Sequence, residues 1–126
     1  MSDAPVACVD LHAHSTASDG AASPEDFVAT AHRAGLVAVA LTDHDTLAGV
    51  RAAQRAAQPH GLRVIAGVEL STVDRGHEVH LLGLHIRDVE AMEDELAAFR
   101  GSRLTRAIAI VERLRSEEHT SELQSH

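Results

Sequence analysis

The chain has 126 residues, of which 44% are hydrophobic and 24% are charged, a composition typical of one small globular domain. Its net charge of -8, with histidine counted as neutral, argues against non-specific binding to nucleic acid or to an anionic membrane. The single cysteine, Cys8, excludes an internal disulfide, and no apolar stretch approaches the roughly 20 residues that span a bilayer. The N-terminal residues lack a signal-peptide pattern, so the expected compartment is the cytoplasm.

The hydrophobic pattern predicts the order β-α-β-α-β-β-α. A strand is expected at 6–11, then a helix at 24–33 that Ser23 caps and Gly35 ends. A strand at 36–41, a helix at 46–57, strands at 63–68 and 78–86 and a helix at 89–115 follow, with an interruption at Gly101-Ser102 left open. Continuous apolar strands alternating with helices indicate an α/β fold with a largely parallel sheet covered on both faces, either open or closed into a barrel.

Residues 115–126 differ from the rest of the chain. They read Arg-Ser-Glu-Glu-His-Thr-Ser-Glu-Leu-Gln-Ser-His and show no apolar periodicity. The stretch is similar, residue for residue, to the in-frame translation of a short-read sequencing adapter. We therefore expect residues 115–126 to be of non-biological origin, residues 1–114 to be the biological part, and the gene to continue beyond this point.

Histidine is over-represented, with ten residues, and several histidines lie near carboxylates at the ends of predicted strands. His12 and His14 are two residues apart on the first strand, so their side chains point to the same side, and Asp19 follows in a polar loop. In parallel α/β folds the carboxyl ends of the strands form the ligand site. The predicted catalytic and metal-binding set is His12, His14, Asp19, His44, Glu69 and His80.

This ligand set predicts a catalytic metal centre. Imidazole and carboxylate ligands without thiolate argue against a structural zinc site of the cysteine-rich kind. More than four candidate ligands imply more than one metal ion, and paired metals are an established arrangement for hydrolysing phosphate esters. Asp10 and Asp43 are predicted to support the site by orienting a ligand rather than by binding metal.

The motifs together resemble those of the PHP (polymerase and histidinol phosphatase) family. They are Asp10-Leu-His12-Ala-His14-Ser-Thr-Ala-Ser-Asp19-Gly, Thr42-Asp43-His44-Asp45-Thr46, Gly67-Val-Glu69-Leu-Ser and His80-Leu-Leu-Gly-Leu. Within the family the sequence is most similar to bacterial phosphoesterases that act on nucleoside 3′,5′-bisphosphates and on the 5′ ends of short RNA. The resemblance implies that residues 1–114 are the N-terminal half of a distorted (β/α)7 barrel.

The resemblance also implies a trinuclear centre, usually manganese and sometimes zinc or iron. His12, His14 and Glu69 would bind the first metal, Asp19 and His44 the second, and Glu69 would bridge to a third that His80 also binds. The family's later ligands, a His or Cys and a final Asp-x-His pair, have no counterpart in this chain.

Substrate-binding roles are predicted at three further positions. By resemblance, Arg103 and Arg106 occupy basic positions that meet substrate phosphates in relatives, although a solvated helix face explains them equally well. His77 lies near His80 and is a weaker candidate for contact with substrate.

The leading hypothesis is a phosphoesterase in which a metal-bridging hydroxide attacks phosphorus. Its expected partner is a small phosphorylated substrate, such as a nucleoside bisphosphate or short RNA; no membrane and no obligate protein partner are expected. Four alternatives stay open: a histidinol-phosphatase-like phosphatase, a PHP accessory module of a DNA polymerase, a metal-dependent amidohydrolase, and an inactive truncated fragment. The amidohydrolase is disfavoured because that class usually adds a metal-bridging lysine, and this chain has none.

Overall fold

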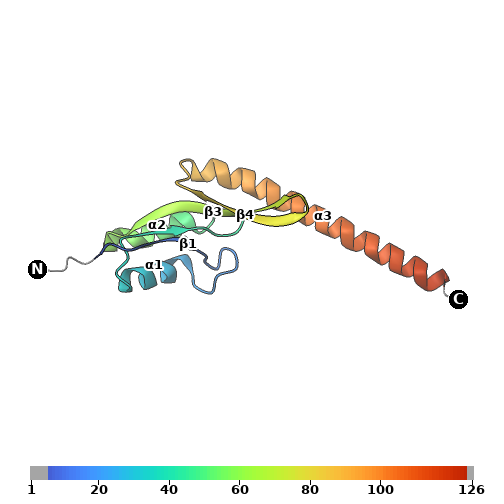
Figure 1. The fold of residues 1–126 in the computed structure, drawn as a ribbon, viewed down its shortest axis with the longest axis horizontal. Coiled ribbons are helices and arrows are strands. Elements are labelled where there is room, and N and C mark those ends of the chain that lie inside the picture. The colour runs from blue at the N-terminus through green and yellow to red at the C-terminus, as the bar shows by residue number, and fades with distance from the viewer. Residues whose placement is uncertain (1–5, 125–126) are drawn as a thin grey trace, which may run out of the picture. The chain divides into compact units, whose positions relative to one another are not determined.

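The computed structural model describes residues 6–124, in the element order that the sequence predicts (Figure 1). The elements are β1 (Val9–Ala13), α1 (Pro24–Arg33), β2 (Ala38–Leu41), α2 (Val50–Ala57), a short 3-10 helix (Gln58–His60), β3 (Arg63–Asp74), β4 (His77–Leu84) and α3 (Val89–Gln124). The chain divides into two compact units, Met1–Asp94 and Glu95–His126, and each is described by itself. The sheet lies in the first unit, and the predicted α/β class is confirmed.

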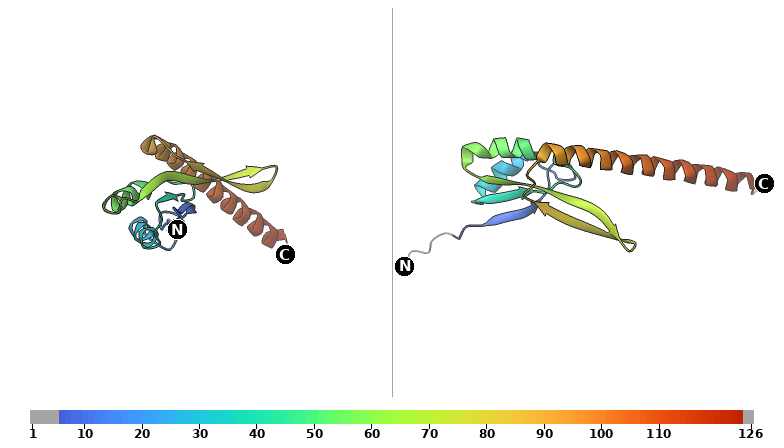
Figure 2. Two further views of the ribbon diagram at one scale, coloured as in Figure 1. Left: turned by 60° about the vertical axis from the view of Figure 1, so that its left-hand side comes forward. Right: turned by 90° about the horizontal axis from the view of Figure 1, so that it is seen from above.

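The sheet has the strand order β1-β2-β3-β4. The pairs β1–β2 and β2–β3 are parallel, whereas β3 and β4 form an antiparallel hairpin that is seen clearly in Figure 2. The hairpin turn consists of Arg75 and Gly76, which both have positive φ angles of 51° and 81°. Two such residues are typical of the tight turn that fixes the register of a hairpin.

A layer formed by α1 and α2 packs against the strands. Ser23 caps α1 by accepting a hydrogen bond from the Asp26 amide at 3.1 Å, and the left-handed Gly35 follows its end, both as predicted. The buried cluster joins α1, β2 and α2, and continues to Leu62 just before β3. Its members are Val28, Ala31, Val39, Leu41, Ala53, Ala57 and Leu62. This core holds the two central parallel strands in place beneath the ends that carry the candidate ligands.

Two expectations about the strands were wrong. The first strand was expected in a sheet covered on both faces, but β1 is an edge strand whose Val9 and Leu11 are 53% and 39% exposed. The third strand does not end near Glu69 but continues to Asp74, because residues 67–74 gain a new partner in β4. Glu69 therefore lies in the middle of a strand rather than at its end.

The helices also differ in detail from the prediction. α2 begins at Val50 rather than near residue 46, because the Glu93 carboxylate accepts hydrogen bonds from the Thr46 hydroxyl and the Leu47 amide at 3.0 and 2.6 Å. These bonds hold Thr46 and Leu47 outside the helix, and a turn at 48–49 leads into it. α3 passes through Gly101 without a break and continues to Gln124. Its helical backbone at 115–124 does not test the predicted non-biological origin of that stretch.

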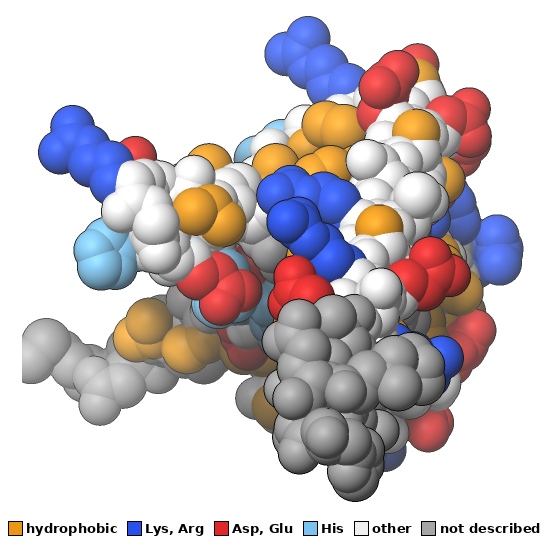
Figure 3. Space-filling model, turned by 90° about the vertical axis from the view of Figure 1, so that its right-hand side faces the viewer, with side chains coloured by type: hydrophobic (Ala, Val, Ile, Leu, Met, Phe, Trp, Pro, Cys, Tyr) orange, Lys and Arg blue, Asp and Glu red, His pale blue; other side chains and the backbone are white. Residues whose placement is uncertain are grey.

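The face drawn in Figure 3 carries mixed charge. On this face, acidic and arginine side chains alternate with hydrophobic ones, without one extended patch of a single sign. Within the described residues, none of the helices combines the length and the apolar character that a bilayer crossing requires.

Candidate metal centre

Glu69 is at the centre of the predicted ligand set. Glu69 lies in the middle of β3 and is only 4% exposed. Its backbone also forms hydrogen bonds to the segment that follows β2. The Glu69 amide donates to the Asp43 carbonyl and the Asp45 amide donates to the Glu69 carbonyl, each at 3.0 Å. This short parallel bridge extends the β2–β3 pairing past the end of β2 and sets His44 beside Glu69.

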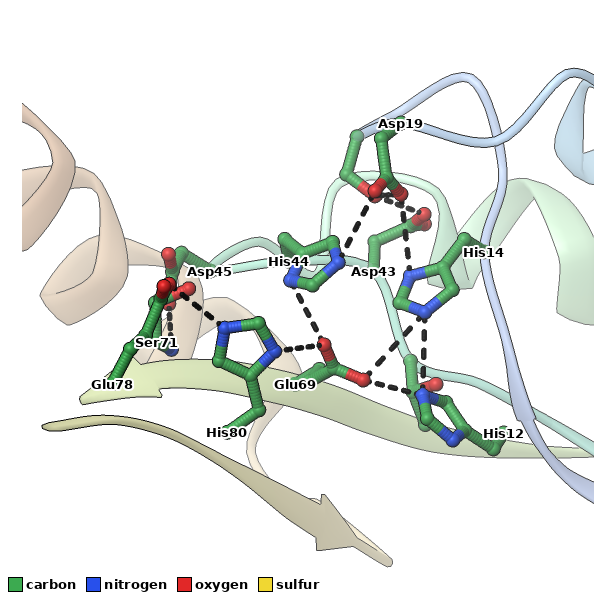
Figure 4. Close-up of polar contacts among 12 residues, drawn as sticks. His12, His14, Asp19, Asp43, His44, Asp45, Glu69, Ser71, Glu78 and His80 are labelled. Atoms are coloured by element: carbon green, nitrogen blue, oxygen red, sulfur yellow. Dashed lines mark hydrogen bonds and ion pairs between the residues drawn. The ribbon is translucent and has the colours of Figure 1, made fainter. Parts of the chain in front are cut away.

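Four histidines surround the Glu69 carboxylate (Figure 4). His12 Nε2 contacts Oε1, and His14 Nε2 lies 3.6 Å from the same oxygen. His44 Nδ1 and His80 Nδ1 each lie 3.0 Å from Oε2. The two carboxylate oxygens thus face different pairs of imidazoles, one pair from β1 and its following loop and the other from the end of β2 and from β4.

Asp19 lies beside His14 and His44, on the far side of their rings from Glu69. Its Oδ2 is 3.2 Å from His44 Nε2, and its Oδ1 is 3.6 Å from His14 Nδ1. The His14 and His44 rings stack, with centroids 4.5 Å apart and an interplanar angle of 12°. Each of these imidazoles therefore has one nitrogen toward Glu69 and the other toward Asp19.

The structure brings all six predicted ligands into three overlapping groups. Within each group, one potential ligand atom per residue lies within 4.8 Å of the others. The groups are His12, His14 and Glu69; His14, Asp19 and His44; and His44, Glu69 and His80. The role of these residues as ligands stays a prediction, but their potential ligand atoms lie close enough together to bind divalent metal ions.

The chemistry of the cluster fits divalent metal. Among the described residues, the buried Nδ1 of His14 has no hydrogen-bond partner, and its 3.6 Å separation from Asp19 is too long for a good hydrogen bond. A buried ring nitrogen without a hydrogen-bond partner beside a carboxylate is explained if both bind one cation. Imidazole and carboxylate together are donors that several divalent ions accept.

The pKa values of Glu69 and His80 are shifted by the residues around them. Burial opposes the ionisation of Glu69, but the hydrogen bond from His12 and the charges of His44, His12 and His14 together hold the Glu69 pKa below its usual value. The hydrogen bond to Glu78, together with the charge of Glu69, raises the pKa of His80. An ionised Glu69 is the form in which it can bind a metal.

Asp43 supports the cluster without facing it. This carboxylate, only 1% exposed, accepts hydrogen bonds from the Ser15 amide at 2.6 Å, the Ser15 hydroxyl at 2.8 Å and the Ser18 hydroxyl at 2.8 Å. These bonds fix the loop between His14 and Asp19. The sequence predicted that Asp43 orients a ligand; in the structure its contacts run to the loop backbone and hydroxyls.

The loop also depends on Gly20. Its amide donates to the Ser15 carbonyl at 2.8 Å, and a Cβ at this position would lie 2.5 Å from the carbonyl oxygen of His14. Only glycine allows so close an approach of two backbone segments. The Asp19-Gly20 pair thus combines a candidate ligand with the residue that lets the loop fold back.

The remaining predicted residues lie outside the cluster. The Asp10 carboxylate accepts a hydrogen bond from the His12 backbone amide at 3.1 Å, so it supports the strand rather than an imidazole ring. His77 is the first residue of β4, three positions from His80 and therefore on the other face of the strand. Arg103 and Arg106 lie on α3 in the second unit, and their contact with substrate stays a prediction.

Sequence reasoning missed the contributions of Ser15, Ser18 and Glu78. The serines are ordinary loop residues by pattern, and only the fold shows that a buried aspartate accepts their hydrogen bonds. Glu78 carried a usable signal, because it is two residues from His80 on a strand and therefore shares its face. Its Oε1 lies 2.9 Å from His80 Nε2.

These features define an α/β domain whose strands converge on a cluster of histidines and carboxylates suited to several divalent ions. Comparison with known proteins gives the family. The PHP domain profile matches residues 10–121, and the chain belongs to the PHP domain family. The α/β fold expected for the N-terminal half of a PHP barrel is thereby confirmed, with a curved four-stranded sheet.

Similar proteins are named for reactions on phosphate esters. The chain is 42% identical over 106 residues to a 5′-3′ exoribonuclease of Haemophilus influenzae, covering 83% of this chain and 39% of the relative. It is 40% identical over 103 residues to a 3′,5′-nucleoside bisphosphate phosphatase of Chromobacterium violaceum, covering 81% and 36%.

A solved structure agrees. The crystal structure of a Bifidobacterium adolescentis protein assigned to the metal-dependent phosphoesterases has a TM-score of 0.71 and 36% identity, covering 90% of this chain and 40% of the other. The chain thus spans about two-fifths of the length of the proteins that it matches.

Proposed function

We propose that the protein is a metal-dependent phosphoesterase that hydrolyses phosphate monoesters of nucleoside 3′,5′-bisphosphates, with the 5′ ends of short RNA as a second substrate. The observation that carries the proposal is the Glu69 carboxylate, whose two oxygens each face a different pair of histidines. Such an arrangement is suited to more than one cation. The names of the two relatives supply the substrate class.

In this proposal His12, His14 and Glu69 hold one ion, Asp19 and His44 a second, and Glu69 and His80 a third, with manganese preferred. When bound, such ions lower the pKa of water and neutralise the charge of a phosphoryl group. The residues of the chain orient the centre: the short bridge fixes the Glu69 backbone, and Asp43 fixes the loop that carries Asp19. A chain with net charge -8 needs such a local centre to attract an anionic substrate.

The proposal is tested by phosphate release from adenosine 3′,5′-bisphosphate in the presence of Mn²⁺. We expect release that EDTA abolishes and that His44→Gln lowers by more than about 100-fold, because a lost ligand costs at least as much as a lost supporting contact. His32→Gln is the matched control, since His32 is an exposed histidine on α1 that stacks on His60. Release of phosphate from histidinol phosphate instead of the bisphosphate would refute the substrate, and no metal-dependent release from either would refute the activity.

A further inference from the structure

Glu78 binds the outer nitrogen of His80. Its Oε1 lies 2.9 Å from His80 Nε2, while His80 Nδ1 lies 3.0 Å from Glu69 Oε2 (Figure 4). The imidazole is thus held between two carboxylates, one on each side. We propose that Glu78 is a positioning residue of the metal centre, which fixes the ring of His80 so that Nδ1 is the atom presented beside Glu69; this inference rests on the proposed function.

The hairpin explains how Glu78 reaches this position. Glu78 and His80 are two residues apart on β4, so their side chains share one face of the strand. The two-residue turn at Arg75 and Gly76 fixes the register, which sets His80 opposite Ser71, two positions along β3 from Glu69. His80 is therefore the diagonal neighbour of Glu69 across the hairpin, a separation that a long side chain spans.

The contact with Glu78 favours one form of the imidazole once a metal ion is bound. A neutral histidine has one protonated nitrogen and one nitrogen with a free lone pair. With a cation bound beside Glu69, donation from Nε2 to Glu78 would keep the proton on Nε2 and leave the lone pair of Nδ1 for the cation. Removing such a carboxylate partner of a metal-binding histidine typically costs 10- to 100-fold in metal affinity.

The effect should be confined to one of the three groups. His80 belongs only to the group with His44 and Glu69, whereas the groups that contain His12 and Asp19 do not include it. Loss of the Glu78 contact should therefore weaken one Mn²⁺ equivalent and leave the others unchanged. A general loss of structure would instead weaken every equivalent.

The experiment is Mn²⁺ titration of the 126-residue chain, with bound ion counted from the loss of the aqueous Mn²⁺ EPR signal. We expect Glu78→Ala to weaken one equivalent by about 10- to 100-fold. We expect Glu78→Gln, whose amide oxygen can still accept from Nε2, to recover most of that loss. Asp74→Ala is the matched control, because it removes an exposed carboxylate from the same hairpin.

A double-mutant comparison shows whether Glu78 acts through His80. In a His80→Ala background, Glu78→Ala should cause no further loss of Mn²⁺ affinity. Unchanged binding in Glu78→Ala, or an equal additional loss without His80, would overturn the inference while leaving the proposed function intact. A wild-type chain that binds no Mn²⁺ would overturn both.

Discussion

Replacing Asp43 with alanine should destabilise the metal-free protein strongly, because it leaves a buried amide without its acceptor. Asp43 and Ser15 are 1% and 0% exposed, so water cannot replace the lost carboxylate. The bond from the Ser15 amide at 2.6 Å joins a charged acceptor to a buried donor, a kind worth about 1.5–3 kcal/mol. The Ser15 and Ser18 hydroxyl bonds add about 1 kcal/mol each, since hydroxyls can rotate toward other acceptors. The expected loss in free energy of unfolding is about 3–5 kcal/mol.

Two further variants separate this cause from a general effect of removing an aspartate. Asp43→Asn keeps one carbonyl oxygen for the Ser15 amide and should cost about 1–2 kcal/mol. Asp10→Ala removes an exposed carboxylate with a single bond to the His12 amide at 3.1 Å and should cost less than about 1 kcal/mol.

The assay is urea unfolding followed by circular dichroism, with EDTA present so that bound metal adds nothing to the measured stability. We expect the order Asp43→Ala, Asp43→Asn, Asp10→Ala from the largest loss to the smallest. Equal losses for the two alanine variants would refute this expectation, because Asp43 is buried and Asp10 is exposed.

Two other expectations concern the same loop and the hairpin. Gly20→Ala should lower the affinity for Mn²⁺, measured by the same EPR titration, because its Cβ would meet the His14 carbonyl oxygen at 2.5 Å and displace the loop. Gly35→Ala is the control: its Cβ would meet no atom within 4 Å, so it adds backbone strain without a close contact. In the metal-free protein, the hydrogen bond to Glu78 is the main cause that raises the pKa of His80. Protonated His80 therefore stabilises the fold most below the unfolded histidine pKa of about 6.5, and this stabilisation is lost as pH rises through the pKa of His80 in the folded protein. The difference in urea midpoint between wild type and His80→Gln should therefore shrink as pH rises from about 6.5 through the pKa of His80 in the folded protein. A difference that does not change with pH would contradict this expectation.

Much of the candidate site could be predicted from the sequence because of one regularity. Parallel strands present their carboxyl ends at one edge, so polar residues that follow separate apolar stretches converge there. His12, His14 and His44 obey this rule, since they lie at or just beyond the ends of β1 and β2. Their convergence required no knowledge of packing.

Glu69 and His80 do not follow this rule, because they lie within strands of the β3–β4 hairpin. The hydrophobic pattern predicted only part of this hairpin. The apolar stretch ends at Val68, so a third strand ending there was the natural prediction. The polar residues beyond it remain in the strand because β4 supplies their backbone hydrogen bonds. Gly76 was a readable signal for the hairpin turn, but the positive φ of Arg75 was not, and the burial of Glu69 depends on segments distant in sequence.

The position of Glu69 in the middle of a strand links metal binding to the assembly of the sheet. A ligand at a strand end can move with its loop, but the Glu69 backbone is fixed by bonds to the segment after β2 and by pairing with β4. β1, by contrast, is an exposed edge strand, and His12 near its carboxyl end contacts the Glu69 carboxylate directly. A cation shared by His12, His14 and Glu69 would join this edge strand to the centre of the sheet. Because such binding is available only to the folded chain, its free energy adds to folding stability, and the residues that hold the metal would also hold β1 in place.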